Sequence, residues 1–599
     1  MSQTSNSTTP AETGWLENDF QRDGERNIWA LKTASGGFGY SDGDRSENYV
    51  LSVIQNATDT SVMSDELAAG MKDWPSTYHL HHQRANLLRA VSDHLSGPIL
   101  EIGAGCGLLT RFMGEEGHQV FALEGSGRRA ATIGARCRDL DNVTVINANL
   151  QDLKTDQKFQ TITLIGVLEY ARVYFSDGSD SDPIDQMLQY VANHLTDDGV
   201  LILAIENQLG LKYFAGYAED HLNYPMAGIE GHYSDKSVVT FGREVLANRL
   251  RGVGLTGQRF AYPFPDYKFP EAVLFDPAMT PDMGGRFAAL VAGAAASDRQ
   301  KPKHLHFALS KALQPVMENG LGGDVANSFL VVASKSEITA SANDYAVYYG
   351  NGDRKKHYLK RVAFQGSADD IVVDRQPLTD DPMPQNEDLT QILEREPFLD
   401  GQLWTQALHD IMARDKWRVA EVTTWAQRWI AALGATVGID TTSSLDSSQQ
   451  IPGKWLDAIP KNMILDKANN AHFVDLEWHQ SDDIPVGYLI VRGLSDAFNL
   501  MEMTGANGEI HHLLTLVRTV CHQLKMPLSE TQIMSYWDQE AALQRKISTR
   551  PGKYRRNQML KTRVAPQAAL KAVKRHGKRD KAVRIITTQY RTLLGKLTK

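Results

Sequence analysis

The chain has 599 residues, of which 42% are hydrophobic and 23% charged, with three cysteines and a formal net charge of −9. This length exceeds what one ordinary hydrophobic core supports, so we expect several domains. No apolar run approaches the roughly eighteen residues of a membrane span, and the polar N-terminal segment lacks a secretory pattern. Three cysteines make neither a disulfide framework nor a metal site, and we expect a cytoplasmic globular protein.

Residues 1–35 are polar, and we expect them to form a disordered or loosely attached leader. Residues 36–54 pass from a turn into a helix, and Asp73-Trp74-Pro75 opens a second helix. This second helix continues through Arg84, and its apolar residues predict one face that packs beside the first strand of a sheet.

A glycine-rich turn between two apolar runs is the most informative stretch of the chain. The first run leads into Glu101, Gly103, Gly105 and Gly107, and the second run ends in Glu124. Glycines let a turn bring its backbone against a ligand, and a terminal acid can bind a ribose diol. The pattern could serve a dinucleotide, or be a structural turn without a ligand. However, an acid two residues before the first glycine resembles motif I of class I S-adenosylmethionine (SAM) methyltransferases.

Further apolar runs at 143–146, 161–167 and 200–205 alternate with helical patterns, which predicts a parallel sheet in an α/β domain. Ligands of such sheets bind at the carboxyl ends of the strands, where Asn149 and Glu169 would join the glycine turn. We therefore predict a Rossmann-like class I methyltransferase domain over residues 36–340. In it, Asn149 or Asp152 would contact the adenine amino group and Leu150 the ring, while Glu169 borders the acceptor pocket.

The acceptor side is expected to follow the fifth strand. Methyl transfer from a sulfonium depends largely on positioning, and a base is needed only where the acceptor must lose a proton, as a sugar hydroxyl does and a phosphate oxygen does not. His221 and His232 lie in a glycine-rich segment and are the predicted catalytic residues; a solvated loop is the alternative.

Five segments carry a more specific resemblance: YSDG (40–43), DWPSTYHL (73–80), the glycine turn, ENQLGLKYFAG (206–216) and YPFPDYK (262–268). Together they resemble bacterial methyltransferases of surface-polysaccharide and O-antigen biosynthesis over roughly residues 36–280. The resemblance implies that Tyr78 and Arg84 contact SAM, with Arg84 holding the methionine carboxylate. A surface ion pair is the alternative role for Arg84.

The second half, predicted to run from 341 to 544, carries a different spacing. Asp457 is followed after four residues by Asn462, and Asp475 comes thirteen further on. This spacing resembles the catalytic loop and metal-binding aspartate of sugar and aminoglycoside kinase-like α+β folds. The resemblance implies that Asp457 orients a hydroxyl acceptor, that Asn462 and Asp475 hold Mg²⁺ on ATP, and that Lys360 contacts phosphate. The usual histidine, the Phe-Gly pair and a helix-C glutamate are missing, so a non-catalytic domain is the alternative.

The pairing of these halves resembles chain-terminating methyltransferase-kinases of O-antigen synthesis, which phosphorylate a glycan end and methylate that phosphate. It implies SAM, ATP and Mg²⁺ as cofactors, a lipid-linked glycan or its terminal phosphate as acceptor, and a glycan polymerase as partner. The alternatives are a methyltransferase acting on a nucleotide-sugar or small molecule with an inert second domain, and a scaffold.

The last predicted element is a tail over residues 545–599. It holds 18 Lys and Arg but one acid, Asp580, so the rest of the chain is strongly acidic. Apolar residues recur among the cations with helical spacing, which predicts a basic amphipathic helix on an anionic membrane, at the inner face of the cell membrane. Nucleic-acid binding and a solvated tail are the alternatives; few aromatics and an acidic body favour the membrane, so no nucleic acid is expected.

Overall fold

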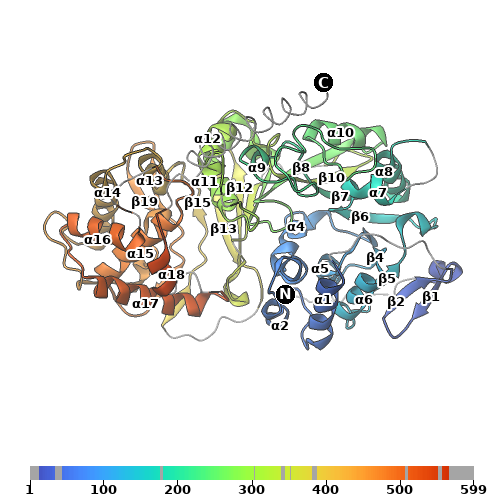
Figure 1. Cartoon of the computed structure of the whole chain (residues 1–599), viewed down its shortest axis with the longest axis horizontal. Helices are drawn as coiled ribbons and strands as arrows, with labels where there is room; N and C mark the ends of the chain where they lie inside the picture. Colours follow the sequence, from blue (N-terminus) through green and yellow to red (C-terminus); the bar gives the residue numbers. More distant parts are fainter. Residues whose placement is uncertain are drawn as a thin grey trace, which may run out of the picture.

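The computed structural model describes residues 13–564, apart from 34–42, 176–179, 303, 339–343, 351, 381–387, 506–509, 511 and 551–555. One mixed sheet of 14 strands runs through the molecule, and the C-terminal helices form a second body at one end (Figure 1). The strand order is β1-β2-β5-β4-β3-β6-β7-β10-β8-β9-β11-β12-β13-β15. Tyr40, Ser41 and Asp42 of the predicted YSDG motif lie outside the described residues.

The centre of this sheet is parallel, as predicted. Its strands are the apolar runs: β3 (Ile99–Ile102), β4 (Val120–Glu124), β5 (Val143–Asn147), β6 (Phe159–Ile165) and β7 (Leu195–Glu206). Because β3 lies between β4 and β6, the strand order reverses there, which makes the carboxyl ends of β3 and β6 the expected ligand crevice. Two antiparallel pairings follow, β10 (Ser328–Ser334) with β7 and with β8 (Gly257–Phe264).

Helices cover both faces of the sheet, as the uniformly apolar strands require. On one face β7 residues such as Leu203 pack with α8 (Pro183–His194), α10 (Arg243–Gly252) and α11 (Pro281–Ala296). On the other face Ile202 packs with residues of α4 (Asn86–Arg89) and α5 (Leu108–Glu115). The lateral helices α1 (Asp44–Asn56), α3 (Trp74–Leu80) and α6 (Gly127–Arg136) lie near the glycine turn.

The predicted loose leader is wrong for residues 13–33. A hairpin of β1 (Phe20–Asp23) and β2 (Ile28–Leu31) extends the sheet, because β2 pairs in parallel with β5. Leu16, Phe20 and Ile28 are at most 2% exposed. These few apolar side chains attach a polar segment to the sheet edge; residues 1–12 and 34–35 lie outside the described residues.

The sheet also continues across the expected domain boundary. Strand β11 (Asp344–Tyr348) pairs with β9 (Ala272–Phe275), and β12 (Lys360–Ser367) and β13 (Asp370–Pro377) extend the sheet further. The second half therefore shares its strands with the first, and what is separate is its helical core. That core contains α13 (Trp404–Met412), α14 (Val419–Val437), α15 (Val486–Asn499), α16 (Leu513–Gln523) and α17 (Glu530–Ile547), beside the hairpin β18 (Met463–Asp466) and β19 (Ala471–Phe473).

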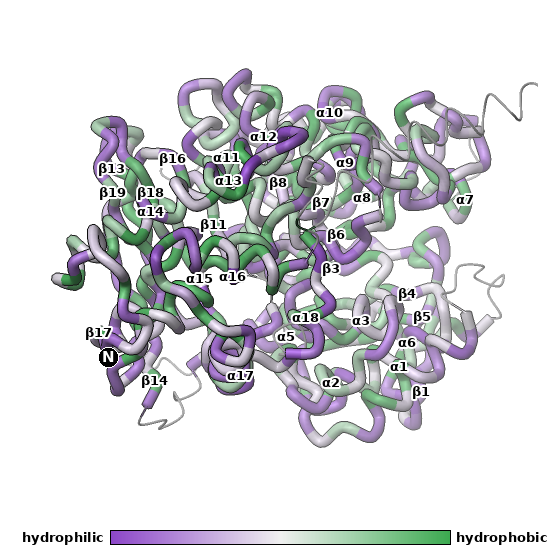
Figure 2. Tube along the Cα trace, turned by 60° about the vertical axis from the view of Figure 1, so that its left-hand side comes forward, coloured by the Kyte–Doolittle hydropathy of each residue, from purple (hydrophilic) through white to green (hydrophobic). Residues whose placement is uncertain are grey.

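The predicted tail begins inside this core. Residues 545–547 complete α17, and α18 (Arg556–Lys561) places Met559 in the helical core with Val564. Residues 565–599, which carry most of the predicted basic helix, lie outside the described residues. Among the described residues no helix is long and apolar enough to cross a membrane. Hydrophobic and hydrophilic segments alternate along the trace in both halves (Figure 2).

Candidate cofactor and acceptor site

A cavity of about 170 Å³ lies at the carboxyl ends of β3, β4 and β6, where the strand order reverses. Eight of the residues predicted to bind the cofactor line it: Tyr78, Arg84, Glu101, Gly103, Gly105, Glu124, Asn149 and Leu150. Two others do not. Gly107 precedes α5, where an added Cβ would lie 3.0 Å from Ile133, and Glu169 is buried behind its neighbour Tyr170, which does line the cavity.

The glycine turn needs glycine for two different reasons. Gly103 and Gly105 have φ of +72° and +60°, which other residues rarely adopt. A Cβ on Gly103 would lie 2.6 Å from a methyl group of Val167, so the turn packs against the strand that follows. A Cβ on Gly105 would meet nothing within 4 Å, because this residue faces the cavity. The turn thus leaves room for a ligand against its backbone.

Glu124 ends β4 and is held from two sides. Its Oε2 accepts the backbone N–H of Gly105 at 2.8 Å, and its Oε1 accepts the N–H of Ser126 at 2.8 Å. The side chain is buried, and burial raises the pKa of Glu124. Each carboxylate oxygen has lone pairs beyond these bonds. The carboxylate is therefore fixed in place as an acceptor for hydroxyl groups.

Arg84 and Glu101 lie at the other end of the cavity. The Arg84 guanidinium lies 3.6 Å from the ring centroid of Tyr78, and its buried Nη1 has no hydrogen-bond partner among the described residues. Glu101 Oε2 accepts a 2.5 Å hydrogen bond from Thr110. Burial, with a smaller contribution from the charge of Glu124, raises the pKa of Glu101 to about 8. The free Nη1 of Arg84 suits a ligand carboxylate, and a cationic ligand group beside Glu101 would lower its pKa and pair with the carboxylate that forms.

An apolar pocket continues beyond β5. Leu150 lines it as predicted, and the Nδ2 of Asn149 donates to Asp152 Oδ2 at 3.2 Å. Tyr174, Phe175 and Met187 line the same region but were not predicted. In the sequence they are marked only by their position after the fourth parallel strand. Aromatic and apolar residues at such a position can line a ligand pocket or pack in a hydrophobic core, and the sequence does not distinguish the two. An aromatic and aliphatic slot of this kind suits a flat heterocycle.

A group of buried ionisable side chains lies behind Tyr170, where the acceptor side was predicted, and the ring of Tyr170 contacts His221 edge-on at 5.3 Å between centroids. His221 Nδ1 lies 3.2 Å from Glu219 Oε1. Burial lowers the pKa of His221, but the carboxylates of Glu206, Glu219 and Glu169 outweigh it and raise this pKa to about 9. Glu169, which was predicted as a site residue, belongs to this group of buried side chains, and its own pKa is raised to about 8, chiefly by burial.

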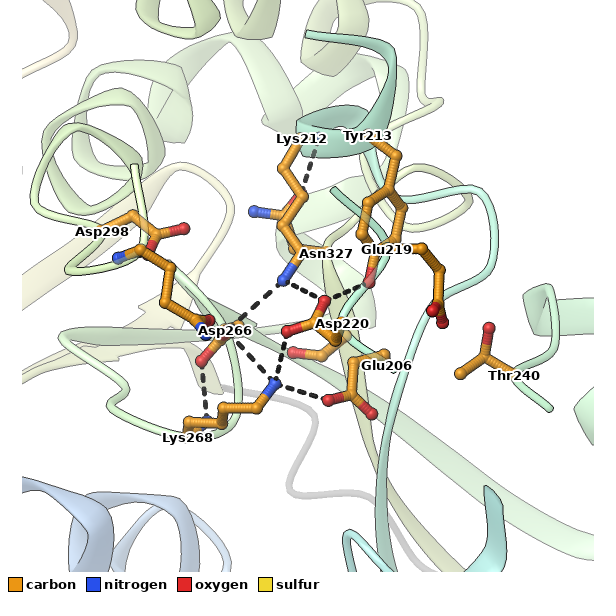
Figure 3. Close-up of polar contacts among 12 residues, drawn as sticks. Glu206, Lys212, Tyr213, Glu219, Asp220, Thr240, Asp266, Lys268, Asp298 and Asn327 are labelled. Carbon is orange, nitrogen blue, oxygen red and sulfur yellow. Dashed lines mark hydrogen bonds and ion pairs between the residues drawn. The ribbon is translucent and has the colours of Figure 1, made fainter. Parts of the chain in front are cut away.

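Two buried lysines lie beside this group, Lys212 in α9 (Leu211–Phe214) and Lys268 in the segment after β8 (Figure 3). Lys268 Nζ lies 2.5 Å from Glu206 Oε1 and 3.1 Å from Asp220 Oδ1, and Lys212 Nζ lies 3.0 Å from Asp220 Oδ2. Tyr267 donates to Glu206 at 3.3 Å. The segments 206–213, 219–221 and 262–270, which the sequence predicts to form the acceptor side, contain all of these residues, although none of them was singled out. Charged residues in an apparent loop segment give no sign that they will be buried.

The other predicted base lies elsewhere. His232 does not line the cavity; its Nδ1 contacts Tyr224 at 3.2 Å, its Nε2 contacts Glu230 at 3.1 Å, and its side chain is 47% exposed. The structure therefore brings His221 to Glu169, and leaves His232 on an exposed loop.

The residues predicted in the second half form one network. Lys360 Nζ lies 2.9 Å from both Asp475 and Glu477, and Arg375 Nε lies 3.0 Å from Asp475. Burial raises the pKa of Asp475, but these cations hold it well below its usual range. Asn462 Nδ2 donates to the backbone oxygens of Asp457 and Asp475, at 3.0 and 3.3 Å.

Asp457 is engaged at both carboxylate oxygens. Its Oδ1 lies 3.1 Å from Arg492 Nη2, and its Oδ2 accepts the backbone N–H of Trp478 at 3.1 Å. The side chain is 5% exposed. The four predicted residues are thus neighbours, but Asp457 and Asp475 are neutralised by protein cations in this conformation.

No family model matches the chain. A segment of 62 residues is 39% identical to ribosomal RNA small subunit methyltransferase A of Streptococcus pneumoniae, covering 10% of this chain and 21% of that protein. The chain thus spans about a fifth of the length of this curated relative.

Similar solved structures are also methyltransferases. A SAM-dependent methyltransferase of Thermotoga maritima, described as a possible histamine N-methyltransferase, is 16% identical, with a TM-score of 0.26 over 43% of this chain and 91% of that one. The CcbJ methyltransferase of Streptomyces caelestis is 12% identical, with a TM-score of 0.27 over 46% of this chain and 98% of that one. Phosphoethanolamine N-methyltransferase 2 of Haemonchus contortus, in complex with SAM, is 14% identical, with a TM-score of 0.25 over 42% of this chain and 52% of that one.

Proposed function

We propose that the protein is a SAM-dependent methyltransferase. The observation that carries this proposal is the cavity at the reversal of the strand order. A glycine turn, a fixed acceptor carboxylate and a guanidinium whose Nη1 has no hydrogen-bond partner among the described residues meet there. These groups fit three parts of one molecule: Glu124 the ribose diol, Arg84 the methionine carboxylate, and Leu150 with its aromatic neighbours the adenine.

SAM would supply a methyl group on a sulfonium that needs no further activation. The task of the protein is then to hold both reactants in line and keep water away, which is where much of the rate arises. The turn at Gly103 and Gly105 fixes the depth of the cavity, and Glu101 faces its charged end. Tyr170 stands between the cavity and the buried acid–base group.

We propose a hydroxyl group of a surface-polysaccharide glycan as the acceptor. A hydroxyl must lose its proton, and His221, Glu169 and Glu206 form an acid–base group beside Tyr170 that can take it up once His221, whose pKa is about 9, has given up its own. This favours a hydroxyl over a phosphate oxygen, which needs no base. The choice of a glycan is supported by the sequence resemblance over residues 36–280; a nucleotide-sugar or small molecule is the alternative.

A second function is proposed for the second half, as a kinase-like unit acting on the same glycan. It is supported by the meeting of Lys360, Asn462 and Asp475 in one network. To hold Mg²⁺ and ATP, Asp475 would have to exchange Lys360 and Arg375 for the metal, and Asp457 would have to leave Arg492. The network as it stands equally supports a non-catalytic domain that binds glycan or a polymerase. Peripheral membrane attachment rests on the sequence of the tail.

The test is methyl transfer from labelled SAM to a lipid-linked glycan, with and without Mg²⁺-ATP. The wild type is compared with Asp475→Asn and with Asp446→Asn, an exposed control in the same half. Labelling that needs ATP and is lost only in Asp475→Asn supports both functions. Labelling independent of ATP and of Asp475 supports a glycan methyltransferase with a non-catalytic second half. Labelling of nucleotide-sugars alone would overturn the glycan acceptor, and no labelling of either would overturn the proposal.

A further inference from the structure

Three metal-binding side chains converge behind the wall formed by Tyr170. Glu169 lies in the short 3-10 turn Leu168–Tyr170 after β6, Glu206 is the last residue of β7, and His221 comes from the loop that follows. One ligand atom of each lies within 4.8 Å of the other two. The two glutamates meet because β6 and β7 are parallel neighbours whose carboxyl ends share one edge of the sheet.

Both glutamates keep an oxygen free. Glu169 and Glu206 are at most 1% exposed, and the Oε2 atom of each is buried with no hydrogen-bond partner among the described residues. Glu206 uses its other oxygen, Oε1, for Lys268 and Tyr267. A buried carboxylate oxygen with no donor is costly, and it indicates a ligand that the polypeptide itself does not provide.

Carboxyl groups outnumber lysines around the three side chains. Five carboxylates face one another here, and two lysines are buried with them: Glu169, Glu206, Glu219, Asp220, Asp266, Lys212 and Lys268. Both lysines lie close to Asp220 and Asp266, and only Lys268 reaches Glu206. On the side where Glu169, Glu206 and His221 meet, the compensating positive charge comes from protons on His221 and Glu169 or from a bound cation.

The orientation of His221 suits a metal ligand. Its Nδ1 is held by Glu219, whose second oxygen accepts the backbone N–H of His221 at 2.8 Å. A carboxylate on one ring nitrogen fixes the tautomer and leaves the other nitrogen, Nε2, for a metal, which is the usual outer-shell arrangement of metal-binding histidines. Glu219 is also held by Tyr233, at 3.4 Å.

We propose that Glu169, Glu206 and His221 bind one divalent first-row metal ion, such as Mn²⁺ or Zn²⁺. Two carboxylates and one imidazole suit these ions better than Mg²⁺ or Ca²⁺, which prefer oxygen ligands throughout. The ion would replace the protons on His221 and Glu169 as the compensating positive charge and would fix Glu169, and with it Tyr170 in the cavity wall. Three protein ligands leave open positions, and an acceptor hydroxyl that reached one would lose its proton more readily; this last step alone rests on the proposed function.

The test uses the full chain, stripped with a chelator and then titrated with MnCl₂ or with ZnCl₂ alone, in the absence of SAM and acceptor. Bound ion is measured by calorimetry and, for Mn²⁺, by the loss of the free-ion electron spin resonance signal. The wild type should bind one ion, and Glu169→Gln should bind it at least tenfold more weakly. Glu230→Gln, which changes an exposed glutamate on the same loop, should bind as the wild type does.

Glu169 has no hydrogen bond through Oε2 to lose, so the glutamine variant is expected to fold; its thermal unfolding is measured in parallel. If it does not fold, His221→Gln takes its place in the same titration. Failure of both ions to bind the wild type would overturn the proposal and leave protons as the compensating charge. Equal binding by wild type and variant would also overturn it. Because no SAM is present, this failure is distinct from a failure of methyl transfer.

Discussion

Replacing Gly105 by alanine separates cofactor binding from folding more cleanly than any other change in the cavity. Gly105 and Gly117 both have positive φ, +60° and +85°, and a Cβ added to either meets nothing within 4 Å. Gly105→Ala and Gly117→Ala should therefore lose similar stability, about 1–2 kcal/mol for an alanine in the left-handed region. Of these two glycines, only Gly105 lines the cavity.

The expected effect on binding follows from that difference. A methyl group placed against a bound ligand forces a displacement that costs about 1–3 kcal/mol, as overpacking does in a core. This corresponds to a dissociation constant for SAM that is about 5- to 150-fold higher in Gly105→Ala. Gly117→Ala should bind SAM as the wild type does. Both constants are measured by isothermal titration calorimetry, with urea unfolding on the same samples.

Equal dissociation constants for the two variants, at equal loss of stability, would show that SAM does not lie against this turn. A larger loss of stability in Gly105→Ala than in Gly117→Ala would show that the open space around Gly105 is filled by the protein itself. Either result would refute the placement of the cofactor.

Three further predictions concern other parts of the same account. Arg84→Gln removes a charged hydrogen bond, worth about 1.5–3 kcal/mol, and should weaken SAM binding about 10- to 150-fold in calorimetry, whereas an unchanged constant would exclude Arg84 from the site. Burial raises the pKa of Glu101 from 4.5 to about 8, so the folded protein keeps a proton that the unfolded chain has lost. Its contribution to stability should fall as pH rises from 4.5 to 8 and level off above, and urea unfolding of Glu101→Gln should lack that part of the slope. Ile28→Ala should cost about 2–5 kcal/mol in urea unfolding, and a change below about 0.5 kcal/mol would mean that the hairpin is loosely attached after all.

The parts of the fold predicted from sequence are those with a local pattern. The apolar runs before Gly103 and up to Glu124 form the expected strands, and eight predicted residues line one cavity. A glycine turn, a terminal acid and alternating strands and helices each depend on residues that are close together in the sequence. They also set the geometry of the crevice, because parallel strands end at a common edge.

Long-range pairing and burial of charge could not be predicted in the same way. The pairing of β9 with β11 joins segments about 70 residues apart, and no local sequence pattern predicts it. The prediction of a loose leader rested on the average polarity of residues 1–35. It was wrong for residues 13–33 because a few apolar side chains among them, such as Phe20 and Ile28, are buried against the sheet. Lys268 and Glu206 resemble solvated residues in sequence, although each is at most 9% exposed in the structure.

The cofactor is tested most directly by titrating the wild-type protein with S-adenosylhomocysteine and, separately, with NAD⁺. Both molecules carry an adenosine whose ribose diol suits Glu124, but only the first carries the amino-acid end that suits Arg84 and Glu101. The account predicts one S-adenosylhomocysteine bound per chain and no binding of NAD⁺ at the same concentrations. Binding of NAD⁺ without S-adenosylhomocysteine would make the cavity a dinucleotide site and contradict the proposed methyltransferase.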